Sequence, residues 1–525
     1  MKNILKNSFW QILFIYSLLV LAMSIGFLWK YSLQMSLFAF IIAFLGLFVL
    51  KPDKEIKINP KIHYFLFSLA VLFIILLRVI PYIGNSVPLG YDVGIYKYGI
   101  EYGLKNLDNW ILQGGMEPGF LYLMEAFKLF FSTDFILEWL FIAFCVLLGS
   151  SIYFVSKESF SKETGLIAIL IYAVSLIQFK TFWYMYYKNM IGLILALFSI
   201  YFLEKSKDNK HLIWLFTLLG GFLGAVHSPT FYIFGLSYLL YTFASPYKYK
   251  SYNFKELKSN IFYGVLILLI TSFFYLGKFR EAILVIIAPV LQSFVQTGES
   301  PGTFINFFTY QYSTLAYLPL GILGFLTLIK NKKFNMLFFW ALITAIIVYF
   351  KFFFFNRFII HLDVALIILA AYGLITLLKS NKKLSVVILS LLLISGGYQI
   401  YQESINSKPL INDEELSLIQ SLSLTEQNAF VMSTDSYYSP WVLGYSNRRT
   451  IAPGLFDYDT HNYEEWYQFW TTNDTNYTNQ FLSVYPKPLY LFIGEYQRMN
   501  MEKFNNECFY LINQQNQSYI YKYLC

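Results

Sequence analysis

The chain alternates between long apolar runs and short polar segments. A helix that crosses a lipid bilayer needs roughly 20 mostly apolar residues. About thirteen runs reach or approach this length: 10–29, 31–50, 62–84, 135–155, 163–179, 186–203, 211–226, 229–244, 260–278, 312–329, 335–350, 358–378 and 384–402. The run 118–131 is shorter and begins at Pro118-Gly119, so we expect a half-helix that dips into the membrane. The pattern predicts a polytopic α-helical membrane protein.

The pattern changes after residue 402. Residues 403–525 contain strand-like runs such as 428–433 and 489–493, separated by polar turns, and no run long enough to cross a membrane. We therefore expect a transmembrane domain over 1–402, with long outer loops at 85–117 and 279–311, followed by a small α/β domain outside the membrane. A loop as long as 279–311 is more often functional than a plain connector.

Two cysteines bracket the last strand-like segments. Cys508 and Cys525 flank two halves that meet around Gln514-Gln515-Asn516-Gln517, which predicts a hairpin centred between 516 and 517. Such a hairpin would place the two cysteines opposite each other, and an oxidising compartment would permit a disulfide. The alternative is two unpaired thiols at a frayed terminus.

Composition supports the membrane class. Of the 525 residues, 57% are hydrophobic and only 13% are charged, whereas soluble proteins carry roughly 25% charged residues. Residues 1–402 hold 32 basic and 17 acidic residues, and residues 403–525 hold 7 and 14. Because the charges segregate in this way, the net charge of +8 reflects membrane orientation and does not indicate a nucleic-acid partner.

Lysine placement predicts the orientation. With the N-terminus in the cytoplasm and alternating spans, the cytoplasmic segments contain 21 lysines, and the outer loops up to residue 383 contain about nine basic residues. This asymmetry is what the positive-inside rule expects. It places the loop 85–117 and residues 403–525 on the outer face of the plasma (cytoplasmic) membrane.

The first outer loop carries four carboxylates, at Asp92, Glu101, Asp108 and Glu117. Asp92 and Glu117 each precede a segment that can start a helix, so a capping role is one interpretation. The other is chemical: two carboxylates at a bilayer surface can bind a divalent ion such as Mg²⁺ or Mn²⁺, or one can deprotonate an acceptor that the other positions.

The order of these residues resembles a known family. An early Asp92, then Asp108-Asn109-Trp110, then Glu117-Pro118-Gly119 is similar to the first outer loop of type-C (GT-C) integral membrane glycosyltransferases. The closest branch contains the protein O-mannosyltransferases and the aminoarabinose transferase of lipid A. This chain departs from it at Val93, where protein mannosyltransferases have a second acid. The resemblance implies that Asp92 and Glu117 are the catalytic pair.

A donor linked to a lipid phosphate needs cations at the outer face. Arg357 resembles the family's Arg at the start of a late span, and an Arg guanidinium chelates phosphate through two hydrogen bonds. Lys188 and His227 are further candidates at span ends. The alternatives are interfacial anchoring for the two cations and a structural role for His227. We expect His361 and Asp363 to pair within the bundle.

In the outer domain, the segment 431–459 has the densest set of acidic, aromatic and basic residues. Asp435, Tyr437, Trp441 and Arg448 suit contacts with a sugar or acceptor, and they equally suit docking of this domain onto the membrane part. The segment is weakly similar to the acceptor-binding region of oligosaccharyltransferase catalytic subunits, but it lacks their Trp-Trp-Asp-Tyr-Gly.

The sequence therefore favours a glycosyltransferase that moves a sugar from a polyprenyl-phosphate donor to a protein, lipid or glycan acceptor on the outer face. A non-enzymatic transporter of lipid or polysaccharide is the alternative from another class. A polysaccharide polymerase or ligase would share much of the topology.

Overall fold

A computed structural model describes residues 2–26, 29–50, 56–103, 116–248, 251–276, 305–352, 355–454, 458–497 and 499–525. These form two compact units. The helical unit comprises Met1–Pro81 and Phe141–Ser407, and the mixed unit comprises Tyr82–Leu140 and Lys408–Cys525. The motif 108–110 and most of the loop 279–311 lie outside the described residues.

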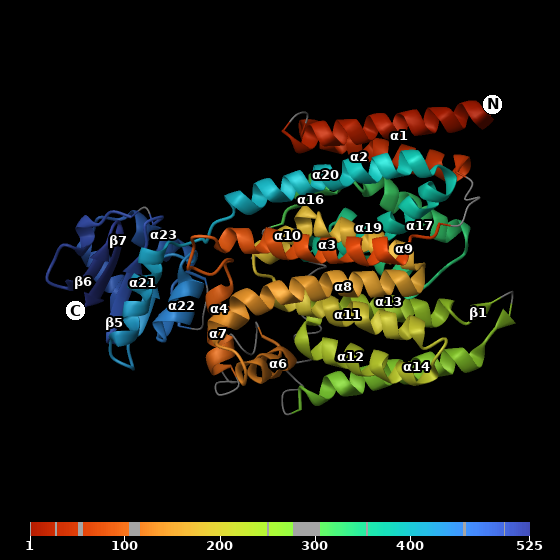
Figure 1. The fold of residues 1–525 in the computed structure, drawn as a ribbon. Coiled ribbons are helices and arrows are strands. Elements are labelled where there is room, and N and C mark those ends of the chain that lie inside the picture. Colours follow the sequence, from red (N-terminus) through yellow and green to blue (C-terminus); the bar gives the residue numbers. More distant parts are fainter. Residues whose placement is uncertain are drawn as a thin grey trace. The chain divides into compact units, whose positions relative to one another are not determined.

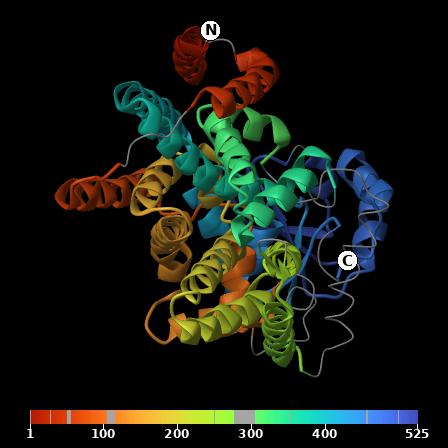
Figure 2. The same ribbon diagram turned by 90° about the vertical axis from the view of Figure 1, so that its right-hand side faces the viewer.

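The helical unit consists of long apolar helices that run alongside one another (Figure 1), seen closer to end-on in Figure 2. Its helices are α1 (Lys2–Ser24), α2 (Ser32–Val49), α3 (Pro60–Val79), α8 (Phe141–Ser159), α9 (Lys162–Ala173), α10 (Leu176–Trp183), α11 (Tyr187–Lys205), α12 (Ile213–Val226), α13 (Ser228–Ala244), α14 (Phe254–Phe273), α16 (Phe307–Thr314), α17 (Leu318–Lys330), α18 (Met336–Tyr349), α19 (Phe355–Ser380) and α20 (Lys382–Asn406). The fold class expected from the sequence, a multi-pass helical membrane protein, is confirmed.

The count of thirteen spans is not confirmed. Among the described residues, eight helices are long and apolar enough to cross a membrane, and ten if two bent pairs each count as one span. The other three runs correspond to α12, α13 and α18, which are helical but have at most 17 residues. These three helices fall short of the 18 residues that this count requires.

Two of the apolar runs contain a sharp break. The helices α9 and α10 meet at a bend of 55°, and α16 and α17 meet at a bend of 85°. Both breaks lie against α19, which contacts α9, α10, α16 and α17. Because 94% of its most apolar stretch is buried, α19 is the central helix of the helical unit.

The mixed unit joins the first outer loop to the C-terminal residues. The loop contributes α4 (Val93–Tyr102), α6 (Pro118–Lys128) and α7 (Thr133–Phe135). The C-terminal residues contribute α21 (Asp413–Ser421), α22 (Ser439–Ser446), α23 (Tyr463–Thr471) and α24 (Thr475–Ser483) around a sheet of β3 (Phe430–Ser433), β4 (Arg449–Ile451), β5 (Leu489–Ile493), β6 (Phe509–Gln515) and β7 (Ser518–Tyr523).

The strand order in this sheet is β4-β3-β5-β7-β6. The strand β3 is parallel to both β4 and β5, and the hairpin β6–β7 adds antiparallel to β5. Since β3 leads through α22 into its parallel neighbour β4, these elements form a βαβ crossover. The small sheet domain expected from the sequence is therefore present.

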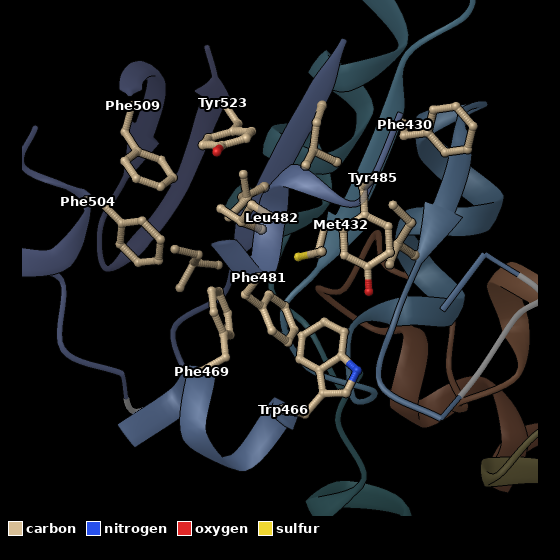
Figure 3. Packing of buried hydrophobic residues seen from close by; sticks show 14 residues of the cluster. Phe430, Met432, Trp466, Phe469, Phe481, Leu482, Tyr485, Phe504, Phe509 and Tyr523 are labelled. Atoms are coloured by element: carbon tan, nitrogen blue, oxygen red, sulfur yellow. The ribbon is translucent and has the colours of Figure 1, made fainter. Parts of the chain in front are cut away.

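Aromatic side chains form the core of the sheet domain. Figure 3 shows Trp466 from α23 and Phe481 from α24 near the sheet residue Met432, with Phe469 of α23 beside Phe481. The rings of Phe469 and Phe481 are stacked with centroids 4.5 Å apart. Burial of several large rings supplies much of the apolar area that holds a small domain together.

The last hairpin carries a crosslink. Gln515 pairs with Ser518 across the turn, and Asn516 takes a left-handed conformation there. Cys508 and Cys525 are joined by a disulfide, with their Cα atoms 5.0 Å apart. The terminus of the chain is thus tied to the strand that begins at residue 509.

Candidate functional site

Asp92 lies at the N-terminus of α4, where the chain enters the first helix of the mixed unit. Its side chain does not accept a hydrogen bond from the first turn of that helix, so capping does not account for the carboxylate. The neighbouring Tyr91 hydroxyl donates to the Ser436 carbonyl at 2.6 Å. Burial, together with the carboxylates of Asp92 and Asp435, raises the pKa of Tyr91 to about 12, so it remains a donor at neutral pH.

The helix α4 crosses α22 at very close range (Figure 1). A Cβ atom on Gly94 would lie 1.8 Å from the Pro440 carbonyl oxygen, and one on Gly444 would lie 2.3 Å from the Gly94 carbonyl oxygen. Only glycine permits backbones to approach this closely. The Gly94–Gly444 crossing therefore holds the start of α4, and with it Asp92, against the sheet domain.

Lys97 secures α4 one turn further on. Its Nζ atom lies 2.9 Å from Asp134 Oδ1 and 3.2 Å from Glu101 Oε1, and 4.8 Å from the ring centroid of Tyr445. Burial alone would lower the pKa of Lys97, but the two carboxylates outweigh it and raise the pKa. Lys97 therefore stays charged and ties α4 to both α7 and α22.

Glu117 lies at the N-terminus of α6, and it too makes no capping hydrogen bond through its side chain. The helices α4 and α6 are in contact, with the rings of Tyr96 and Phe120 5.7 Å apart. Gly99 faces the sulfur of Met116, the residue before Glu117. The two candidate catalytic carboxylates thus precede neighbouring helices of one unit.

Asp435 and Tyr437 follow the carboxyl end of β3. Ligands of open α/β sheets commonly bind outside the carboxyl ends of parallel strands. Asp435 Oδ1 accepts from the Tyr437 backbone N–H at 2.7 Å, and the Tyr437 hydroxyl donates to the Leu410 carbonyl at 2.6 Å. Because Tyr91 bonds to Ser436, the loop that carries Asp92 reaches this same edge of the sheet.

Trp441 and Arg448 are engaged inside the sheet domain. Trp441 is completely buried and stacks on Tyr445 with ring centroids 5.7 Å apart. The guanidinium of Arg448 donates to the carbonyls of Ser423 and Thr425 and to the Thr425 hydroxyl. These contacts place both side chains in the packing between α22 and its neighbours.

In the helical unit, the structure links the three phosphate-binding candidates. Gly192 lies one turn after Lys188 on α11 and packs against His227. A Cβ atom added to Gly192 would be 3.0 Å from the Cβ atom of His227. Thr230, three residues after His227, is 3.2 Å from His361 Nε2, and His361 lies one turn after Arg357 on α19. Lys188, His227 and Arg357 therefore gather at one end of the helical unit.

His227 has a structural contact as well. Its Nδ1 accepts from the backbone N–H of Thr230, so the His227 side chain caps α13. The same nitrogen is 2.7 Å from the Thr230 hydroxyl. An acceptor Nδ1 leaves Nε2 as the protonated nitrogen of the neutral ring. Lys188 is half-buried and Arg357 is exposed, so Arg357 is the more accessible cation.

The sequence interpretation missed a polar centre inside the bundle. His361 and Asp363 do have partners within it, but not each other: His361 bonds to Thr230, and Asp363 bonds to Ser175, Gln178 and Tyr317. One signal was available. Ser175 and Gln178 form an S-x-x-Q pattern, which marks a helix start within the run 163–179.

No group of three or more His, Cys, Asp or Glu side chains suited to a metal ion occurs within the described ranges. Asp92 and Glu117, the pair that the sequence suggests for an ion, supply two carboxylates. That donor set fits Mg²⁺, which usually takes one or two carboxylates and keeps several waters or substrate oxygens.

Comparison with known proteins points to one family of folds. A family model described as Dolichyl-phosphate-mannose-protein mannosyltransferase matches residues 117–276. A search among curated proteins finds no match.

Three solved structures have a similar fold. ArnT from Cupriavidus metallidurans, bound to undecaprenyl phosphate, has a TM-score of 0.57 and 11% identity, over 87% of this chain and 97% of that one. The Archaeoglobus fulgidus oligosaccharyltransferase with Zn and sulfate has a TM-score of 0.57 and 13% identity, over 81% and 67%. The same organism's AglB, with an inhibitory peptide and a dolichol-phosphate, has a TM-score of 0.50 and 15% identity, over 82% and 69%. The fold that the resemblance implied is thereby confirmed: the chain has the fold of the GT-C integral membrane glycosyltransferases.

Proposed function

We propose that this protein transfers a sugar from a polyprenyl-phosphate donor to an acceptor on the outer face of the membrane. The observation that carries the proposal is the placement of Asp92. Its carboxylate lies at a helix N-terminus that the Gly94–Gly444 crossing holds against the sheet domain, in a chain with the GT-C fold. The likeness to structures with bound undecaprenyl phosphate and dolichol-phosphate supports a donor of this class.

In the proposed reaction the acceptor's nucleophilic atom attacks the anomeric carbon while the bond from that carbon to the phosphate oxygen breaks. Asp92 takes the proton that the acceptor loses, and the polyprenyl phosphate leaves with the electron pair. Glu117, on the neighbouring helix, positions the acceptor. Such general-base catalysis contributes typically 10²–10⁴-fold to the rate.

Lys188 and Arg357 stabilise the charge that develops on the leaving phosphate. Electrostatic stabilisation of developing charge by fixed groups often contributes more to the rate than any other single effect. His227, with its proton on Nε2, can donate a further hydrogen bond. If a divalent ion is needed, Asp92 and Glu117 would hold it, and its positive charge would offset negative charge at the reacting phosphate.

On the acceptor side, Asp435 and Tyr437 are the better supported pair. Both lie at the sheet edge that the Tyr91 loop reaches. We leave Trp441 and Arg448 out of the proposed acceptor site, because the first is completely buried and the second is held by carbonyl groups of its own domain.

The test is transfer from a labelled polyprenyl-phosphate sugar in membranes that contain the protein. We expect Asp92→Asn to reduce transfer by at least about 100-fold, because the amide keeps the shape of the side chain but cannot accept the proton. Glu125→Gln is the matched control: Glu125 lies in the same unit, on α6, and pairs with Lys128 at 3.3 Å. This control should retain transfer.

Full transfer by Asp92→Asn would contradict the role of Asp92. The transporter alternative would be favoured by two results together. The wild type would transfer no sugar to any of a panel of neutral glycan, peptide and glycolipid acceptors, and the labelled lipid would move between leaflets.

A further inference from the structure

Asp363 is a completely buried carboxylate in the central helix α19. Its Oδ2 atom accepts from the Ser175 hydroxyl and from the Gln178 amide, both at 2.8 Å. Its Oδ1 atom accepts from the Tyr317 hydroxyl at 2.5 Å. All three partners are electrically neutral, so hydrogen bonding orients the carboxylate without balancing its charge.

No ion pair compensates this charge within the described ranges. The titratable groups that face Asp363 from α9, α16 and α17 are three tyrosines, Tyr172, Tyr310 and Tyr317. Arg78 lies over the ring of Tyr172, with its guanidinium carbon 5.7 Å from the ring centroid, but it forms no hydrogen bond with Asp363. An unpaired charge inside a membrane bundle is costly, which makes such a residue a binding-site candidate.

The oxygen atoms around Asp363 come from both helix breaks. Ser175 lies at the bend between α9 and α10, and Tyr317 lies at the bend between α16 and α17. Their hydroxyl oxygens are 3.4 Å apart. In membrane proteins, broken helices that meet at a carboxylate commonly line binding sites for small cations.

Gln178 supplies an independent indication. Its amide nitrogen donates to Asp363 and to the Ile360 carbonyl, while its Oε1 atom is buried and has no hydrogen-bond partner among the described residues. A buried carbonyl oxygen without a donor is uncommon and calls for a specific explanation. A cation beside the carboxylate would satisfy this oxygen as well as the charge.

We propose that Asp363, Ser175, Gln178 and Tyr317 bind one monovalent cation, Na⁺, which holds the two helix breaks together. The donors are all hard oxygen atoms, which suit alkali and alkaline-earth ions. The single carboxylate balances one positive charge, so a divalent ion would leave the site with a net charge. None of these four residues is among the proposed sugar-transfer residues, and the proposal does not depend on that function.

The test is thermal unfolding of the purified full-length protein in detergent, in NaCl, KCl or choline chloride at equal ionic strength. A ligand that binds only the folded state raises the unfolding temperature with its concentration. We expect the wild type to unfold at least about 3 °C higher in about 150 mM NaCl than in choline chloride. Equilibrium binding of radioactive ²²Na⁺ should give one site per chain.

Asp363→Asn should abolish both effects, and Gln178→Leu should weaken ²²Na⁺ binding at least about tenfold. Should Asp363→Asn fail to fold, Tyr317→Phe, which keeps the ring and removes one oxygen, provides the same comparison. Glu403→Gln is the matched control, because Glu403 is a carboxylate of the helical unit that pairs with Lys180. It should keep the response to Na⁺.

Two results would overturn the proposal. One is equal stability of the wild type in NaCl and choline chloride without ²²Na⁺ binding. The other is a stability that is independent of Na⁺ but changes with pH in the wild type and not in Asp363→Asn, which would assign a bound proton instead.

Discussion

Lys503 places a charged amino group inside the aromatic core of the mixed unit. It is 1% exposed, and its Nζ atom lies 4.3 Å from the ring centroid of Phe469 and 5.5 Å from that of Phe504. The ammonium donates to the Phe469 carbonyl, and no carboxylate pairs with it in the described part of the chain. Burial lowers the pKa of Lys503 to about 8, so the folded state holds this proton less tightly than the unfolded state does.

This difference predicts how stability depends on pH. Between pH 8 and about 10.4, the ordinary lysine pKa, the unfolded state binds the proton and the folded state does not, so the free energy of unfolding rises with pH. We expect Lys503→Met to raise this free energy by about 2 kcal/mol at pH 7, because it removes a buried charge that lacks an ionic partner. The advantage over the wild type should shrink as the pH rises toward 10.

The measurement is chemical unfolding of both proteins at pH 7 and pH 10, followed by the fluorescence of the tryptophans. Lys522→Met serves as the control, since Lys522 lies on β7 of the same unit and pairs with Glu426 at 2.6 Å. An advantage for Lys503→Met that is equal at both pH values would contradict the low pKa.

At the scale of elements, the crossing of α4 and α22 decides where Asp92 lies. Gly94→Ala would put a methyl group 1.8 Å from the Pro440 carbonyl, which the two backbones can relieve only by moving apart. We expect about 2–4 kcal/mol of destabilisation and a loss of sugar transfer that exceeds the loss of folded protein. Transfer per amount of folded protein, compared with that of the wild type, measures this.

Gly235→Ala on α13 is the matched control, because a Cβ at that position meets nothing within 4 Å. Replacing an open helical glycine by alanine should leave stability unchanged or raise it by up to about 1 kcal/mol. Equal effects of the two substitutions would show that the crossing does not position Asp92.

The elements themselves follow closely from local sequence. Each apolar run is helical, and the strand expected at 489–493 is β5. Both agree with the sequence because the hydrophobic pattern of a short window is enough to indicate the type of element. The breaks inside 163–179 and 312–329 do not follow from the pattern, since an uninterrupted apolar run gives no sign of a bend. Their signals are single residues, Ser175 in one case and Pro319 in the other, and each acts as a helix start.

The chemistry of the site is less accessible from sequence than the elements are. Asp92 and Glu117 are recognisable from motif order. The contacts that hold α4, and with it Asp92, come from α22 and α7, and pairings over such sequence distances leave no local pattern. His361 and Asp363 do pair within the bundle as expected, but the sequence did not give their partners, because those of Asp363 are up to 188 residues away.

At the scale of the whole molecule, the two chain stretches that form the mixed unit constrain the membrane topology. This unit is built from Tyr82–Leu140 and Lys408–Cys525, with hydrogen bonds between the two stretches such as that from Tyr91 to Ser436. A compact unit cannot have a bilayer running through it, so both stretches must lie on one side of the membrane. The excess of lysines in the opposite loops predicts an outer location for this side, and we propose that orientation.

Cysteine labelling tests this arrangement in intact cells. On a background of Cys145→Ala, the disulfide of Cys508 and Cys525 leaves no reactive thiol on the outer side, and Ser86→Cys, Gln427→Cys and Asp208→Cys each introduce an exposed one. We expect a membrane-impermeant maleimide to label positions 86 and 427 in intact cells, and position 208 only after permeabilisation. Labelling of 86 and 427 from opposite sides would contradict the mixed unit itself. Labelling of both only after permeabilisation would keep that unit but invert the orientation, and it would place the disulfide in a reducing compartment, where such bonds rarely persist.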